Sequence, residues 1–254
     1  MSKIVITGSA SGIGREVAKK LSDAGHEITG IDLRDADIIA DLSTSEGRQK
    51  AIADTLEKTG SEIDILITAA GMGGHLADGK LVMIVNYFGT VELLDGFFPA
   101  MKGRAGAAAL ALSSNSAQMG VDPENELVKA LLAHDEQAAI DVVGDMPSAA
   151  TYGLSKHAVA RAVRRRAHEW GTAGVRLNAI APGMTETPML QGVRDNPDLK
   201  GALENIPVPL DRTANVGEIA NIIVMMVSEA FSFMHGSVLY VDGGTDAVVR
   251  PDQF

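Results

Sequence analysis

The sequence predicts an α/β fold in which a single domain is built on a doubly wound parallel sheet. Short apolar runs alternate with segments whose apolar residues recur at helical spacing, which is typical of strand–helix–strand units. The run at 63–68 is apolar except for Asp64, as expected of a strand that helices cover on both faces. No repeat or linker interrupts the 254 residues, so we expect one domain. The predicted strands are 3–7, 27–31, 63–68, 107–112, 175–180 and 237–241.

Composition excludes several classes of function. The net charge of −11 repels nucleic-acid phosphates, and an aromatic content of 4% leaves little surface on which bases could stack. The absence of cysteine removes disulfides, thiolate metal sites and cysteine nucleophiles, and we expect no metal site. The N-terminus lacks a signal-like apolar run, and no stretch reaches the roughly 20 consecutive apolar residues of a membrane helix. We therefore expect a cytoplasmic protein that binds neither membranes nor nucleic acid.

The first strand leads into a glycine-rich turn with the spacing G-x-x-x-G-x-G, and a helix follows it until Gly25. In this context glycines permit a tight turn, and the helix N-terminus offers free N–H groups to a pyrophosphate. The alternative is that the glycines only turn the chain. The residues expected to bind a dinucleotide here are Gly8, Ser11, Gly12, Ile13 and Gly14. Such a turn in a doubly wound sheet predicts a Rossmann-type domain.

The second strand ends at Asp32, where a carboxylate can accept hydrogen bonds from the adenosine ribose. The same charge would repel a 2′-phosphate, which favours NAD over NADP. Arg34 lies two residues further on and could pair with a 2′-phosphate, so NADP remains possible.

The middle of the chain contributes two more candidate residues. Ser43 and Glu46 form a possible capping box for a helix that ends near Thr59. Asn86 lies in a long apolar helix predicted over 81–101, where it is either functional or a satisfied buried amide. Ser114 follows the strand at 107–112, at the sheet edge where ligands of parallel sheets bind.

Tyr152 and Lys156 stand four residues apart, so on a helix both side chains leave the same face. An ammonium group near a phenol favours the phenolate and lowers the phenol pKa, which would let Tyr152 exchange a proton with a substrate oxygen. The helix is expected to run to about Trp170. Its basic residues are interpreted as a solvated face with some ion pairing: Arg161, Arg164, Arg165 and Arg166.

After the strand at 175–180 comes Pro182–Gly183, and a polar, turn-rich stretch follows from about 185 to 209. A segment of this kind after a strand end is a natural lid over a substrate. The last predicted helix spans roughly 215–228.

Together these motifs resemble the short-chain dehydrogenase/reductase family over essentially the whole chain. Thr7-Gly8-x-x-x-Gly12-x-Gly14 matches the family's cofactor turn. The resemblance implies a catalytic tetrad of Asn86, Ser114, Tyr152 and Lys156. It also implies cofactor contacts beside the adenine and the nicotinamide, from Asp41, Leu42, Ala69, Ala70, Gly71, Tyr152, Lys156, Pro182, Gly183, Thr185 and Thr187.

The mechanism implied by this resemblance is hydride transfer between a nicotinamide ring and a secondary alcohol or ketone. Ser114 would hydrogen-bond the substrate oxygen, and Tyr152 would exchange the proton. Lys156 would lower the phenol pKa and bind the nicotinamide ribose, and Asn86 would help to hold a water chain for proton relay.

The chain departs from the common family pattern by an acidic insertion at about 120–147, which is expected to form two short helices. Asp122 would cap the first helix. The insertion could be a surface excursion, a wall of the substrate cleft, or a cover for a helix that many relatives use to oligomerise. Together with the tail Arg250-Pro251-x-Gln253-Phe254, it is similar to the bacterial hydroxysteroid dehydrogenase/carbonyl reductase group. That similarity implies an NAD(H)-dependent enzyme acting on 3α-hydroxysteroids or other bulky carbonyl compounds, and a homo-oligomer, with a dimer favoured.

Two other functions remain open at this point. The protein could be an NADP(H)-dependent alcohol dehydrogenase for bulky ketones without a steroid role, or a non-catalytic nucleotide sensor on the same fold.

Overall fold

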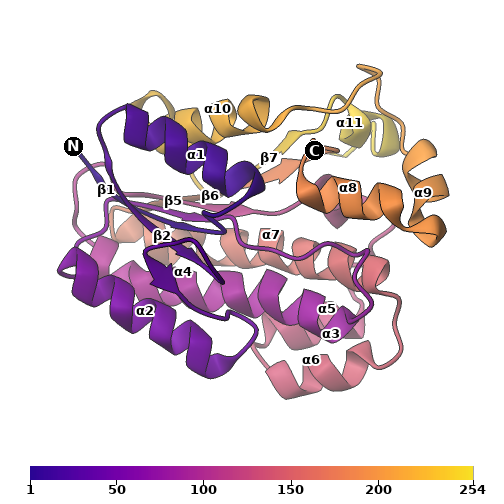
Figure 1. Cartoon of the computed structure of the whole chain (residues 1–254), viewed down its shortest axis with the longest axis horizontal. Coiled ribbons are helices and arrows are strands. Elements are labelled where there is room, and N and C mark those ends of the chain that lie inside the picture. The colour runs from indigo at the N-terminus through magenta and orange to yellow at the C-terminus, as the bar shows by residue number, and fades with distance from the viewer. Residues whose placement is uncertain (254) are drawn as a thin grey trace.

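A seven-stranded, fully parallel sheet forms the centre of the molecule, in the order β3-β2-β1-β4-β5-β6-β7 (Figure 1). The computed structural model describes residues 1–253, so Phe254, in the tail that carries part of the resemblance, lies outside it. The strand order reverses between β1 and β4, the point where ligands of such sheets bind. The expected doubly wound α/β fold is confirmed. The strands are β1 (Lys3–Thr7), β2 (Glu27–Asp32), β3 (Ile38–Ile39), β4 (Ile65–Thr68), β5 (Ala108–Leu112), β6 (Arg176–Pro182) and β7 (Val238–Val241).

Helices cover both faces of the sheet because alternate strand residues point to opposite sides. Ile4 and Ile6 pack under α1 (Gly12–Asp23) and α10 (Val216–Val227), while Val5 belongs to the core on the other face. The second face is covered by α2 (Ser45–Thr59), α4 (Gly89–Met101) and the long α7 (Ser148–Thr172). In Figure 1 these helices lie on the opposite side of the sheet from α1 and α10.

The helix predicted over 81–101 is a three-part segment. It comprises α3 (Gly79–Met83), a π-helical turn (Ile84–Phe88) and α4. By length and composition Gly79–Met101 could span a membrane, with a mean hydropathy of 1.4, but 72% of its most apolar window is buried inside the protein. The segment is therefore a core helix. π-helical turns often mark functional sites, and this one contains Asn86.

The insertion forms the two expected helices, α5 (Glu126–Leu132) and α6 (Glu136–Val143). The expected cap was wrong, because Asn125 caps α5 and the Asp122 carboxylate accepts instead from the Glu124 N–H, 2.9 Å away. Leu127, Val128 and Leu131 are fully buried in the main core, so the insertion is an integral part of the domain.

The arginines of α7 have the partners that the sequence led us to expect. Arg161 donates to the carbonyl of Pro123 (2.6 Å), and Arg165 donates to that of Leu132 (3.5 Å), so both hold the insertion against α7. Arg166 forms a bidentate pair with Asp95.

A second cap differs from the prediction. Thr44 rather than Ser43 caps α2, accepting from the Gly47 N–H at 3.0 Å. Beyond β6, the predicted lid contains α8 (Pro188–Asp195) and α9 (Pro197–Glu204), and a short α11 (Thr245–Val249) follows β7.

Candidate active site

The glycine turn after β1 is packed too tightly for any side chain at two positions. Gly8 has φ of +69°, and a Cβ there would lie 2.7 Å from the backbone nitrogen of Ala70. A Cβ on Gly14 would lie 2.2 Å from the carbonyl oxygen of Gly8. The end of β4 joins the same turn, since the Ala70 N–H donates to Thr7 Oγ1 at 3.0 Å. The structure thus brings Gly8 and Gly14 together with the Ala69–Gly71 segment.

The N-terminus of α1 is open to an anion. Ser11 occupies the cap position without a side-chain cap bond, and the first turn contains no acidic residue. The unpaired N–H groups of this turn and the positive end of the helix dipole therefore face the sheet edge. Gly12 and Ile13, both predicted to bind the dinucleotide, are the first two residues of this turn.

Asp32 ties the end of β2 to the glycine turn. Its carboxylate accepts from the Ala10 N–H at 3.0 Å and from the Leu33 N–H at 2.7 Å, while the side chain stays partly exposed. Each carboxylate oxygen keeps further acceptor capacity for ribose hydroxyls. Arg34 is exposed two residues further on.

Asp41 and Leu42 follow β3, on the side of the sheet that the family resemblance assigns to the adenine. Asp41 is exposed and accepts from the Ser43 N–H at 2.9 Å. Leu42 is buried and packs against α4, where a Cβ on Gly89 would lie 3.2 Å from the Leu42 side chain.

Asn86 is fully buried and satisfied by one backbone segment. Its Oδ1 accepts from the Met72 N–H (2.8 Å), and its Nδ2 donates to the Met72 carbonyl (3.0 Å). These bonds fix the loop that follows Gly71. A Cβ on Gly71 itself would lie 2.9 Å from Asn86 Oδ1 and 3.4 Å from Lys156 Nζ. Asn86 is thus a buried amide whose hydrogen-bonding groups both have partners, which was one of the two expectations from the sequence. It also lies close to Lys156.

Ser114 and Tyr152 meet at the carboxyl end of β5. The hydroxyl oxygen of Ser114 accepts from the N–H of Ser116 (3.2 Å) and from its Oγ (2.9 Å), which leaves the Ser114 O–H as a donor. Burial raises the pKa of Tyr152 above its usual value, and a hydrogen bond with Ser114 acts in the opposite direction.

Lys156 lies on the same face of α7, with Nζ 6.0 Å from the centre of the Tyr152 ring. The ammonium donates to the Leu112 carbonyl at 2.9 Å, and burial lowers its pKa to about 8. The Ser114 hydroxyl lowers the phenol pKa, and the further lowering by Lys156 that the sequence leads us to expect stays a prediction.

The segment predicted to be a lid begins close to the glycine turn. A Cβ on Gly183, just after β6, would lie 2.7 Å from Asp242 Cα, so the turn leaves no room for one. Thr185 Oγ1 donates to the Gly183 carbonyl at 2.9 Å, and Thr187 caps α8. A Cβ on Gly12 would touch the Thr187 methyl group at 3.6 Å. Pro182, Gly183, Thr185 and Thr187 therefore lead the chain from the sheet edge over the turn.

The chain is similar to known proteins over its full length. Residues 2–124 match the family described as short chain dehydrogenase, and residues 137–246 match the one described as enoyl-(acyl carrier protein) reductase. A 3-alpha-hydroxysteroid dehydrogenase/carbonyl reductase from Comamonas testosteroni is 46% identical, with 100% of both chains covered. The chain belongs to the short-chain dehydrogenase family.

Two further similarities agree with this assignment. The crystal structure of the 3-alpha-hydroxysteroid dehydrogenase from Pseudomonas sp. B-0831, complexed with NADH, superposes with a TM-score of 0.97 at 42% identity over 100% of both chains. An A-factor type gamma-butyrolactone 1'-reductase from Streptomyces virginiae is 30% identical, over 94% of this chain and 93% of its own. This short-chain dehydrogenase is therefore an oxidoreductase.

His75 is a residue of this short-chain dehydrogenase that sequence reasoning missed. Its ring lies between two glycines, because a Cβ on Gly73 would be 2.6 Å from Nδ1 and one on Gly192 of α8 would be 2.4 Å from Nε2. The imidazole thus joins the loop after β4 to the lid helix. In the sequence, only Gly73 and Gly192 relate to this contact, and two glycines so far apart form no pattern that predicts it.

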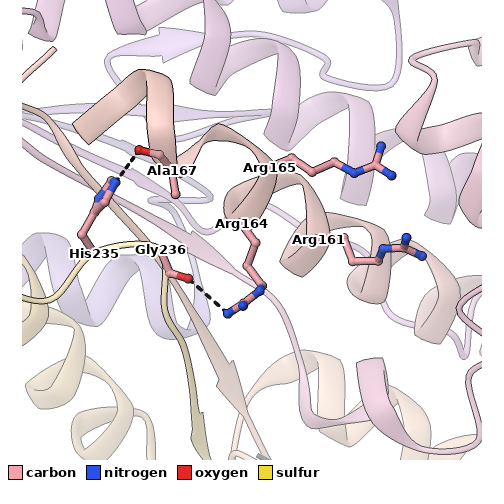
Figure 2. Close-up of a pocket in the computed structure, with 6 residues that line it drawn as sticks. All are labelled: Arg161, Arg164, Arg165, Ala167, His235 and Gly236. Carbon is pink, nitrogen blue, oxygen red and sulfur yellow. Dashed lines mark hydrogen bonds between the residues drawn. The ribbon is translucent and has the colours of Figure 1, made fainter. Parts of the chain in front are cut away.

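A basic groove on the outer side of α7 is separate from these residues. It measures about 460 Å³ and is lined by Arg161, Arg164, Arg165, Ala167, His235 and Gly236. Figure 2 shows His235 bonded to the Ala167 carbonyl and Arg164 directed at the carbonyl of Gly236. No predicted catalytic residue lines this groove. Its hydrogen bonds hold α7 to the β6–β7 connection.

Proposed function

We propose that this short-chain dehydrogenase transfers hydride between NAD(H) and a secondary alcohol or ketone, with a 3α-hydroxysteroid or another bulky carbonyl compound as substrate. One arrangement carries the proposal: Ser114 stands at the sheet edge close enough to the Tyr152 phenol to lower its pKa, and Lys156 lies one helical turn away on the same helix. These are the groups needed to hold and protonate an alkoxide beside a hydride acceptor.

The residues present fit a dinucleotide. The glycine turn excludes side chains at Gly8 and Gly14, and the first turn of α1 has free N–H groups for a pyrophosphate. Buried polar atoms without a partner in the described protein lie nearby, namely Oγ of Ser9 and Nδ2 of Asn115. When bound, the nicotinamide ring supplies the hydride chemistry. The group that would distinguish NAD from NADP is Asp32.

The chain's own contribution is to the proton and the substrate oxygen. In alcohol oxidation the Ser114 O–H holds the substrate oxygen while the Tyr152 phenolate accepts its proton. In ketone reduction the phenol returns that proton. The Lys156 ammonium supplies positive charge beside the phenolate, and Asn86 fixes the loop that follows Gly71. The water relay through Asn86 remains part of the proposal.

A bulky substrate is supported by the two hydroxysteroid dehydrogenases that this chain resembles over their full length. The predicted lid helices, α8 and α9, carry apolar residues such as Met189 and Val193 beside charged ones, and we propose that they cover a large apolar substrate.

The experiment is oxidation of a 3α-hydroxysteroid such as androsterone with NAD and, separately, with NADP, measured as absorbance of the reduced nicotinamide. Turnover with NAD supports the proposal in full. If the protein reduces a bulky aryl ketone but does not oxidise androsterone, the proposed reaction stands and the steroid substrate is ruled out. A preference for NADP would instead favour the second candidate, in which the exposed Arg34 binds the 2′-phosphate.

We also propose a cytoplasmic homodimer. The support for the dimer is the full-length similarity to the hydroxysteroid dehydrogenase/carbonyl reductase, and a chain without cysteine suits the reducing cytoplasm. Light scattering after size-exclusion chromatography tests the dimer, and a mass of one chain at micromolar concentration would contradict it.

A further inference from the structure

Arg48 of α2 is the largest charged side chain buried in the described protein, with 1% of its surface exposed. Its guanidinium is met on three sides. Nε pairs with Glu92 of α4 at 2.7 Å, Nη2 with Glu136 of α6 at 2.5 Å, and Nη1 donates to the Leu42 carbonyl at 3.3 Å. A buried cation is strongly unfavourable unless it is paired in this way. The three contacts therefore depend on one another.

Each partner belongs to a different part of the protein. Glu136 is the first residue of α6, inside the insertion, and Glu92 follows the π-helical turn that contains Asn86 and Phe88. Leu42 is the residue assigned to the adenine side of the cofactor site. Figure 1 shows α2, α4 and α6 on one side of the sheet, where a single side chain can join them.

Two aromatic contacts tighten the same junction. The Arg48 guanidinium carbon lies 5.7 Å from the centre of the Phe88 ring, and His134, in the connection between α5 and α6, packs against that ring at 5.4 Å. His134 Nε2 is also 4.0 Å from the Glu92 carboxylate. The insertion thus contacts the junction through both Glu136 and His134.

We propose that Arg48 is a positioning residue that couples the insertion to the adenine end of the cofactor site. Glu136 fixes the guanidinium, and the guanidinium holds the Leu42 carbonyl, so a helix of the insertion sets the backbone assigned to the adenine side. The insertion then serves cofactor affinity. This inference depends on the proposed NAD(H) site.

The test is Glu136→Gln, which keeps the side-chain shape and removes the charge that pairs with Arg48. The dissociation constant for NADH, measured by titration calorimetry, should rise about 3- to 10-fold, as expected when one charge-assisted hydrogen bond stops supporting a binding wall. AMP, which carries only the adenine half, should weaken by a similar factor, and the steroid KM at saturating NAD should stay unchanged.

The matched control is Glu126→Gln, the same substitution on the other insertion helix, where an exposed carboxylate pairs with Lys129. It should bind NADH and AMP like the wild type. Equal affinities in the two variants, or a loss of thermal stability in Glu136→Gln with unchanged NADH affinity, would overturn the proposal. A wild-type protein that binds no NADH at all would instead contradict the proposed function.

Arg48→Lys gives a second measurement, because a single ammonium group cannot reach all three partners. If it folds by circular dichroism, its NADH affinity should fall at least as far as that of Glu136→Gln. Wild-type affinity in Arg48→Lys would refute the role of the guanidinium. If the variant does not fold, the Glu136 comparison decides alone.

Discussion

Replacing Ser116 with alanine should slow alcohol oxidation although Ser116 is not expected to touch the substrate. Its Oγ donates to the Ser114 oxygen at 2.9 Å, and its N–H does so at 3.2 Å. These two bonds occupy the acceptor side of Ser114 and leave the Ser114 O–H to point at the substrate oxygen. The Ser116→Ala variant removes the first bond and keeps the second.

The size of the effect follows from the bond removed. One neutral hydrogen bond contributes a net ~0.5–1.5 kcal/mol, which corresponds to a roughly 2- to 12-fold lower kcat. Ser114→Ala removes the donor at the reacting oxygen itself, and losses of about 10²–10³-fold are typical of such a donor. Because the Ser114 bond lowers the pKa of Tyr152, its loss should raise that pKa and move the alkaline rise of kcat/KM to higher pH.

The assay is steady-state oxidation over a pH series for the wild type, both single variants and the double variant. NADH affinity should be unchanged in all four. If Ser116 acts through Ser114, the double variant is no slower than Ser114→Ala. If Ser116→Ala lowers kcat by the same factor in the wild type and in the Ser114→Ala variant, this reasoning is refuted.

Three further predictions concern other parts of the site. Asp32→Ala should lower kcat/KM for NAD relative to NADP, and an unchanged ratio would show that Asp32 does not discriminate. Gly192→Ala places a methyl group 2.4 Å from His75 Nε2, so KM for a bulky alcohol should rise severalfold with NADH affinity intact. Adding His75→Ala to the Gly192→Ala variant should restore the KM. If it does not, the clash between the new methyl group and His75 is not the cause of the change. Lys156→Met should abolish turnover yet raise Tm at pH 7, because burial lowers the pKa of this amine from 10.5 to about 8 and penalises its charged form. By the same linkage, wild-type stability should increase as pH rises from 8 towards 10.5, where the unfolded chain binds the extra proton; a lower Tm in the variant would contradict this.

The strands and the glycine turn could be predicted because they follow from local patterns. Apolar runs fixed by burial on both faces gave β1, β4 and β5 with small errors at the ends. Gly8 and Gly14 were predictable because a strand–turn–helix context demands glycine where backbones approach closely.

The misplaced caps have a different cause. Asp122 and Asn125 are both good capping residues, and so are Ser43 and Thr44. Asn125 is the residue that caps α5, and α5 packs against α7 with Leu127 and Leu131 buried in the core. The sequence alone contains no record of that packing.

The electrostatics of the site also lay beyond the sequence. Spacing placed Tyr152 and Lys156 on one helix face, but not their burial or the Leu112 carbonyl that takes the lysine's N–H. Asn86, in the π-helical turn, makes two bonds to Met72, a loop residue 14 positions earlier, and no local pattern predicts this pairing. The catalytic roles of these residues stay predictions until variants are assayed.

The most direct test uses androsterone carrying deuterium on the carbinol carbon, incubated with NAD and followed by mass spectrometry of the reduced cofactor. Hydride transfer from that carbon predicts NADH with one deuterium, and Tyr152→Phe should bind NADH but yield almost no labelled product. Unlabelled NADH, or labelled NADH formed at the wild-type rate by Tyr152→Phe, would contradict the account.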